Sequence, residues 1–261
     1  MKKAIVFCSF GVSDARARQA CLDASAELIQ QHFPAFTVRQ AYTSVFIQKR
    51  LKAQGIVIDS LPEALDRLQQ EGFEQVIIQP SHLTPGEEFD QKVMRAADEA
   101  ADKFRSLRVS HPVFAAPEDY PRALAAILPE LPLTSGEQLV LLGHGSPHHH
   151  NPVYERLQQE ADRQHLPVHV GVLEQSDTPD YGTVRRRLQA CEADQVLLAP
   201  LLLAGGMHVT SDMAGDAPES WKSRLTADGY TVRTDLRGLG EYPAFRALYL
   251  RRLEELLPAE C

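Results

Sequence analysis

Three residues in the second half of the chain have side chains that bind divalent transition metals. His144 stands between two glycines, Glu174 follows an apolar run, and His208 ends the glycine-containing segment 201–208. Each alone has an ordinary explanation, such as a strand-to-helix turn, a solvated loop acid or a partly buried histidine. Together, at three successive predicted strand ends, two imidazoles and a carboxylate suit a first-row divalent ion. They predict a metal site, where a neutral imidazole can hold the ion or accept a proton.

The first half of the chain also places polar residues after a predicted strand. His82, Glu87 and Glu88 lie in the loop 80–88, although the two glutamates also suit the first turn of a helix, where the helix dipole favours acids. The run His148-His149-His150 looks like a stronger metal motif. Consecutive positions cannot all face one ion in a regular element, so we interpret this run as a solvated loop.

Motifs for common cofactors and nucleophiles are missing from the sequence. No GxGxxG follows the first predicted strand and no GxxxxGK[ST] occurs, which disfavours dinucleotide and P-loop nucleotide sites. The sequence Gly143-His144-Gly145-Ser146 lacks the central serine of a nucleophile elbow. We therefore expect no organic cofactor and no α/β-hydrolase chemistry.

Composition narrows the possible partners. The chain has 261 residues, 44% of them apolar, and a net charge of −8, which argues against a nucleic acid or an anionic membrane as the main partner. No apolar run approaches the roughly 18 residues of a membrane span, and the apolar start is too short for a signal peptide. We therefore expect a cytoplasmic protein. The four cysteines are scattered without a CxxC pair, so no zinc ribbon or disulfide framework is indicated.

Short apolar runs alternate with stretches of helical period, the pattern of an α/β protein with parallel sheets covered on both faces. The predicted strands are 3–8, 36–42, 75–79, 107–113, 138–142, 168–173, 195–199 and 230–234. The predicted helices are 13–31 with Ser13 as its cap, 44–54, 61–70, one from about 87, 152–164, 179–191 and 242–257. The Pro-rich stretch 116–132 receives no element.

The two halves resemble each other when aligned by hand. The paired segments are Ser9–Gly11 with Gly143–Gly145, Tyr42–Ser44 with Leu173–Gln175, and Gln75–Pro80 with Gln195–Pro200. Continuing the last pair places Glu88 on His208. We therefore predict two similar Rossmann-like domains, 1–134 and 135–261, with the terminal helix 241–257 as a candidate to pack back on the first.

Several of these motifs, in this order and over nearly the whole chain, resemble the sirohydrochlorin cobaltochelatases of anaerobic cobalamin biosynthesis. These are class II chelatases, similar in fold to ferrochelatase. The segments that carry the resemblance are 3–13, 41–44, Gly143–Gly145, Glu174, 205–208, 211–213, 220–222 and 238–243.

The resemblance implies two domains, each a four-stranded parallel sheet flanked by helices, with the active site in the cleft between them. It implies that His144, Glu174 and His208 bind cobalt and that His144 is the catalytic proton acceptor. It also implies substrate-binding roles for Ser9, Phe10, Gly11, Val12 and Ser13. The internal duplication, which places Glu88 opposite His208, predicts that His82 and Glu88 face the tetrapyrrole. Val12 departs from the threonine expected in the family's loop, and Pro147 with the polyhistidine run is atypical.

The implied reaction inserts Co²⁺ into sirohydrochlorin and releases two protons, with metal and tetrapyrrole both as substrates. Lys49, Arg50 and Lys52 are candidate contacts for the carboxylates of the tetrapyrrole, although they also suit a solvated helix face. Two alternatives stay open: a non-catalytic tetrapyrrole or metal carrier on the same fold, and a chelatase for Fe²⁺ or Ni²⁺, since affinity order alone does not select cobalt. A homo-oligomer is also left open.

Overall fold

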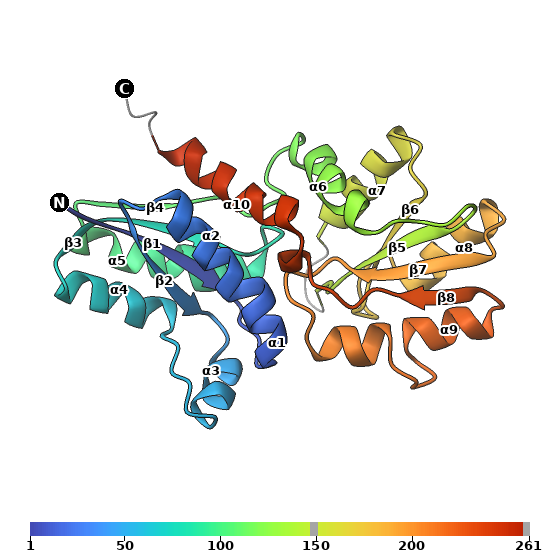
Figure 1. Cartoon of the computed structure of the whole chain (residues 1–261), viewed down its shortest axis with the longest axis horizontal. Helices are drawn as coiled ribbons and strands as arrows, with labels where there is room; N and C mark the ends of the chain where they lie inside the picture. Colours follow the sequence, from blue (N-terminus) through green and yellow to red (C-terminus); the bar gives the residue numbers. More distant parts are fainter. Residues whose placement is uncertain (147–150, 258–261) are drawn as a thin grey trace. The chain divides into compact units, whose positions relative to one another are not determined.

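The computed structural model describes residues 1–146 and 151–257, and its contacts divide the chain into two compact units (Figure 1). Unit 1 comprises Met1–Ala115 and the C-terminal segment from Pro243, and unit 2 comprises Ala116–Tyr242. By contacts, residues 116–134 belong to unit 2. The predicted domain division at residue 134 stays a prediction. Among the described residues, no helix has the length and apolarity needed to span a membrane.

Unit 1 contains a parallel four-stranded sheet in the order β2-β1-β3-β4. Its strands are β1 (Lys2–Ser9), β2 (Thr37–Tyr42), β3 (Phe73–Pro80) and β4 (Ser106–Val109). Its helical segments are α1 (Ala15–Ala17), η1 (Arg18–Asp23), α2 (Ala24–His32), α3 (Val45–Lys52), α4 (Leu61–Gln70), η2 (Phe89–Met94), α5 (Arg95–Ala100), η3 (Ala101–Lys103) and α10 (Pro243–Leu256), of which η1 and η2 are π-helical.

Alternation along β1 directs its side chains to two cores. Ala4, Val6 and Cys8 are buried with the apolar faces of α4 and α5. On the other face, Phe7 meets Tyr249 of α10 edge-on, with ring centroids 5.6 Å apart. Helices therefore cover both faces of the sheet, and the carboxyl ends of its strands remain free for loops.

Unit 2 repeats this architecture with the strand order β6-β5-β7-β8, again all parallel. Its strands are β5 (Gln138–Gly143), β6 (Val168–Val172), β7 (Gln195–Pro200) and β8 (Thr231–Thr234). Its helical segments are α6 (Asp119–Ile127), η4 (Leu128–Glu130), α7 (Val153–Arg163), α8 (Tyr181–Ala190), π-helical η5 (Val209–Met213), α9 (Trp221–Ala227) and η6 (Leu239–Glu241). The predicted α/β class with two parallel four-stranded sheets is confirmed.

The first predicted helix and the fourth predicted strand differ from the structure. Asp14, not Ser13, caps the first helix, because its carboxylate accepts from the backbone N–H of Ala17 at 2.8 Å. That helix is also interrupted by η1. The predicted strand 107–113 ends at Val109, since the chain then leaves the sheet and Val113 donates to the carbonyl oxygen of His82.

Two helices were missed by the sequence analysis. α6 lies in the Pro-rich stretch that received no element, and its Pro121 falls in the first turn, where the missing N–H has no helical partner to lose. α9 is capped by Ser220, whose hydroxyl accepts from the N–H of Ser223. Both helices are short, so their periodic pattern is weak in the sequence.

The internal resemblance has a structural counterpart, with one correction to the alignment. The sheets share a strand order, and Glu88 and His208 each directly precede a π-helical segment, η2 or η5. The second pairing is displaced by one residue, however. Ser44 donates its N–H to Phe10 as Glu174 donates to His144, so Ser44, not Thr43, is the equivalent of Glu174.

The C-terminal helix α10 belongs to unit 1, where it packs on α2 and β3. Tyr249 is almost fully buried and donates its hydroxyl to the carbonyl oxygen of Ser81 at 2.9 Å. Burial of Phe245 and Leu253 on the same helix face completes the contact.

We expect Tyr249→Phe to lower the free energy of unfolding by about 1–2 kcal/mol, because the buried carbonyl of Ser81 loses its donor while the ring packing is kept. Chemical denaturation measures this effect. Arg251→Ala on the same helix is the control: it removes only an exposed pair with Glu255 and should change stability by about 0.5 kcal/mol or less. Equal losses in the two variants would contradict the assignment.

Candidate metal centre

The three predicted metal ligands lie at the carboxyl ends of three neighbouring strands of unit 2. β5 lies between β6 and β7, and because all three run parallel their ends meet at one edge of the sheet. His144 directly follows β5, one residue separates Glu174 from the end of β6, and His208 ends the loop after β7. The order of the sheet thus brings together residues that are 64 positions apart in the sequence.

The rings of His144 and His208 are in contact, with centroids 4.7 Å apart and planes at 87°. Nδ1 of His144 lies 3.0 Å from the carbonyl oxygen of Gly145, and Nδ1 of His208 lies 2.6 Å from a carboxylate oxygen of Asp212. Both partners are acceptors, so each Nδ1 carries the hydrogen when these bonds form. Each Nε2 is then left with a lone pair for a metal or a proton.

The glycines on either side of His144 are required by their neighbours. A Cβ on Gly143 would lie 2.2 Å from the ring of Tyr154, and Gly145 has a φ of +78° with Glu174 packed against it. The buried hydroxyl of Tyr154 accepts from the N–H of Gly145 at 3.3 Å, and burial raises the pKa of Tyr154 above its usual range. These contacts hold the turn that presents the imidazole of His144.

Glu174 is held beside His144 through its backbone, while its carboxylate has another partner. Its N–H donates to the carbonyl oxygen of His144 at 2.9 Å, and its Oε1 accepts from the hydroxyl of Ser176 at 2.9 Å. Hydrogen bonds from Ser176, and secondly the nearby His144, lower the pKa of Glu174. Among residues 1–146 and 151–257, no group of three or more His, Cys, Asp or Glu side chains is arranged to hold a metal ion.

In unit 1, His82 has a different environment from the histidines of unit 2. Both its ring nitrogens are shielded from solvent without a hydrogen-bond partner, and its ring meets Phe89 edge-on at 6.1 Å. Burial lowers the pKa of His82 to about 4, so its imidazole is neutral at pH 7. A proton-handling role would require this ring to move toward solvent.

Glu88 and the loop after β1 occupy the corresponding edge of the unit 1 sheet. The carboxylate of Glu88 accepts from the hydroxyl of Thr43 at 2.5 Å. Within the loop, Ser9 and Val12 are buried, whereas Phe10 is 52% exposed. Gly11 has a φ of +94° against the ring of Tyr42. Phe10 is therefore the side chain of this loop that is most available to a ligand.

Helix α3 follows β2 at this edge and carries an exposed aromatic residue beside exposed cations. Phe46 is 66% exposed, and Lys49 and Arg50 follow it by three and four positions, which places all three on one helix face. Lys52 is also exposed. An apolar ring next to positive charge suits a flat apolar ligand that has carboxylates at its rim.

Several site neighbours were not recognised in the sequence. Asp212 lies four residues after His208, a spacing that places two side chains together on a helix, so this pair could have been found. The contact of Tyr154 with Gly145 depends on tertiary packing, and the local contact of Ser176 with Glu174 depends on the rotamer of Glu174, so neither left a signal in the sequence. Pro147 and the run His148–His150 lie outside the described residues.

Comparisons with known proteins identify the family of this chain. The family model described as cobalt chelatase (CbiK) matches residues 3–257. The curated sirohydrochlorin cobaltochelatase CbiKC of Nitratidesulfovibrio vulgaris is 36% identical over 99% of this chain and 92% of its own length. The sirohydrochlorin cobaltochelatase of Salmonella typhimurium is 32% identical over 98% of this chain and 97% of its own length.

Among solved structures, the sirohydrochlorin chelatase SirB from Bacillus subtilis subspecies spizizenii, in complex with cobalt, has a TM-score of 0.63. The match covers 98% of this chain and 95% of that one at 16% identity, which supports the fold alone. The family model and the two curated relatives confirm the resemblance found in the motifs. The chain belongs to the cobalt chelatase (CbiK) family.

Proposed function

We propose that this protein inserts Co²⁺ into sirohydrochlorin and that His144, Glu174 and His208 bind the incoming ion. The observation that carries this proposal is the pairing of His144 and His208, 4.7 Å apart between ring centroids, on neighbouring strand ends of unit 2. Sirohydrochlorin as the tetrapyrrole is supported by the names of the two curated relatives.

The ligand set suits a metal that must be released again. His144 and His208 each offer Nε2, and Glu174 joins them when its carboxylate turns away from Ser176. A site with three protein ligands leaves positions open for the tetrapyrrole nitrogens, whereas a closed tetrahedral site would trap the ion. The carboxylate offsets the charge of the ion without adding a third imidazole.

Metal insertion also requires a base. Two pyrrole N–H bonds break, the nitrogen electron pairs bond to Co²⁺, and two protons leave for solvent. Nε2 of His144 is the candidate acceptor, because its Nδ1 is occupied by the carbonyl of Gly145 and its lone pair is free again once the ion has passed to the tetrapyrrole nitrogens. His82 and Glu88 of unit 1 and the loop Ser9–Ser13 are proposed to contact the tetrapyrrole.

The physiological metal and the cellular setting are further parts of the proposal. Cobalt is favoured over Fe²⁺ or Ni²⁺ by the family description. A cytoplasmic location and a homo-oligomer stay predictions.

We expect His208→Ala and Glu174→Gln each to weaken Co²⁺ binding by about tenfold or more, because the first removes an imidazole nitrogen and the second replaces an anionic carboxylate with a neutral amide. Titration of the tetrapyrrole-free protein with Co²⁺ measures this directly. Ser176→Ala is the matched control, since it frees the carboxylate of Glu174 and should leave the affinity unchanged or higher. Retained affinity in His208→Ala would exclude this residue as a ligand.

His144→Ala should lower the insertion rate by roughly 10²–10⁴, the range for a lost general base, while sirohydrochlorin binding changes little. Stopped-flow absorbance at fixed free Co²⁺ measures the rate. If the protein were a carrier, neither the wild type nor His144→Ala would insert Co²⁺ faster than buffer alone.

The wild-type rate should fall as the pH is lowered, because a protonated imidazole can neither bind cobalt nor accept a proton. Glu174 is not the expected cause of this fall, since its lowered pKa keeps it ionised further into acid. His82 is also not expected to be the cause above about pH 5, because its pKa of about 4 keeps it neutral there. His82→Gln should therefore retain the acid limb of the rate profile, and loss of that limb would reassign the base to His82.

Lys49→Gln and Arg50→Gln should each raise the KM for sirohydrochlorin several-fold with little change in kcat, because the cations attract its carboxylates before and after the reaction alike. The effect should shrink as salt is added. Lys103→Gln makes the same charge change at a residue paired with Asp66, so it serves as the control. A KM equal to that of the wild type at low salt in both Lys49→Gln and Arg50→Gln would exclude the α3 face from substrate binding.

A further inference from the structure

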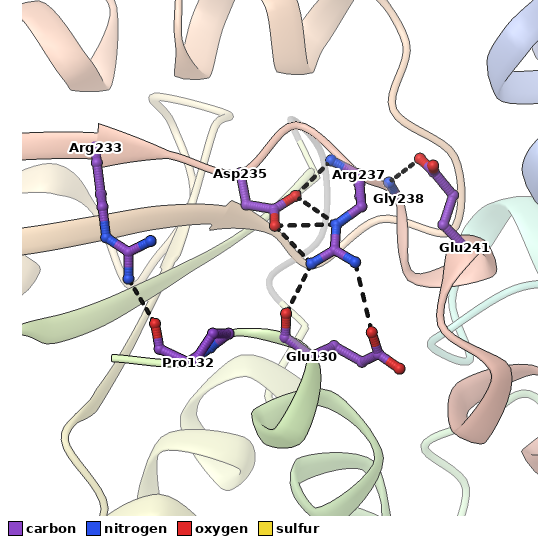
Figure 2. Close-up of polar contacts among 7 residues, drawn as sticks. All are labelled: Glu130, Pro132, Arg233, Asp235, Arg237, Gly238 and Glu241. Atoms are coloured by element: carbon purple, nitrogen blue, oxygen red, sulfur yellow. Dashed lines mark hydrogen bonds and ion pairs between the residues drawn. The ribbon is translucent and has the colours of Figure 1, made fainter. Parts of the chain in front are cut away.

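Arg237, outside the candidate metal site, makes several hydrogen bonds in the segment that follows β8 (Figure 2). The guanidinium of Arg237 donates to the carboxylate of Asp235 from Nε at 3.0 Å and from Nη2 at 2.8 Å. Nη2 also donates to the carbonyl oxygen of Glu130 at 2.7 Å, and the Glu130 carboxylate lies 3.4 Å from Nη1. The hydrogen bonds to Asp235 raise the pKa of Arg237 above its usual range.

The same arginine is also packed on a buried ring. Its guanidinium carbon lies 4.9 Å from the ring centroid of Tyr242, which is fully buried. Nearby, the N–H of Gly238 donates to the side chain of Glu241 at 3.2 Å (Figure 2). The segment from Asp235 to Tyr242 is thus held by side-chain contacts at both ends, with Arg237 contributing to each.

This segment packs backbone to backbone against the loop after β7. Leu239 donates its N–H to Leu202 at 2.9 Å, and Gly240 donates to Leu203 at 2.8 Å. A Cβ on Gly238 would lie 2.5 Å from the carbonyl oxygen of Leu203. A Cβ on Gly205 would likewise lie 2.6 Å from that of Leu236, so both positions require glycine for this approach.

The loop supported in this way leads directly to His208. Leu201 at its start donates to the carbonyl oxygen of Leu142 in β5, and Gly206 near its end accepts from Val209 at 3.0 Å. His208 is the N-cap of the π-helical segment η5, and its side chain does not cap that segment. The place of the His208 backbone therefore depends on β5 from one side and on the segment 235–242 from the other.

We propose that Arg237 is a positioning residue for His208: by fixing the segment 235–242 against the loop 201–205, it sets the place of the His208 imidazole beside His144. This inference rests on the proposed role of His208 as a ligand of Co²⁺. Arg237 itself touches neither the ion nor the tetrapyrrole in this role. Two nitrogens of the planar Arg237 guanidinium donate to Asp235, so a lysine would supply the charge without this bidentate contact.

The test compares Arg237→Ala and Arg237→Lys with Arg233→Ala in the full-length protein. Arg233 lies on the adjoining strand β8 and donates to the carboxylate of Glu137 at 2.6 Å. It also donates to the carbonyl oxygen of Pro132 at 2.6 Å (Figure 2). We expect both Arg237 variants to weaken Co²⁺ binding by about tenfold, the usual scale for a lost outer-shell partner. Arg233→Ala should lose stability in chemical denaturation and keep its affinity for Co²⁺.

A double variant separates positioning from general destabilisation. In a His208→Ala background, Arg237→Ala should cause no further loss of Co²⁺ affinity, because the ligand that it positions is already gone. If the two losses instead add, or if Arg237→Lys binds Co²⁺ as the wild type does, the positioning role is overturned. If His208→Ala alone has no effect on Co²⁺ binding, the proposed function fails first, which distinguishes the two failures.

Discussion

Parallel pairing of β6, β5 and β7 is the constraint on which the candidate metal centre depends. Backbone hydrogen bonds continue the pairing beyond the strands: Glu174 donates to His144, and Leu201 donates to Leu142. They fix where each loop leaves the sheet, so two residues far apart in sequence start from neighbouring points on one edge. The rings of His144 and His208 can then meet without any covalent or metal link. Helices on both faces leave this edge as the place where polar side chains reach solvent.

The same framework in unit 1 carries different chemistry. Phe10, Ser44 and Glu88 occupy the positions equivalent to His144, Glu174 and His208. Phe10 exposes an apolar ring, Ser44 caps α3, and Glu88 accepts a hydrogen bond from Thr43. A pair of imidazoles is therefore absent from this set of equivalent positions, which presents an apolar ring and a single carboxylate. Substitution at equivalent positions thus gives one sheet edge two imidazoles and the other an exposed apolar ring.

Much of this could be predicted from the sequence, because strand ends carry a local signal. The apolar runs located β5, β6 and β7 to within a residue at each end, and the parallel class then placed His144, Glu174 and His208 at one edge. The side-chain partners could not be predicted in the same way. The bond from Ser176 to Glu174 is a matter of rotamer choice, and the burial of His82 depends on packing against Phe89. The one-residue error in aligning Ser44 arose because periodicity locates a strand without giving its register.

The contrast between a fixed backbone and adjustable side chains suits a metal that is a substrate. The turn at His144 is held by Tyr154, Gly143 and Gly145. The loop that leads to His208 is held by the close contact of Gly205 and Gly238 with the facing backbone. The ligand side chains themselves are at the surface, and Glu174 is retained by Ser176 through hydrogen bonds that water can replace. An ion bound by such a set gains two preplaced imidazoles and a carboxylate that can join or leave. In the proposed function, the rigid backbone would keep the two imidazoles in place, while the loosely held carboxylate would allow the ion to be passed on.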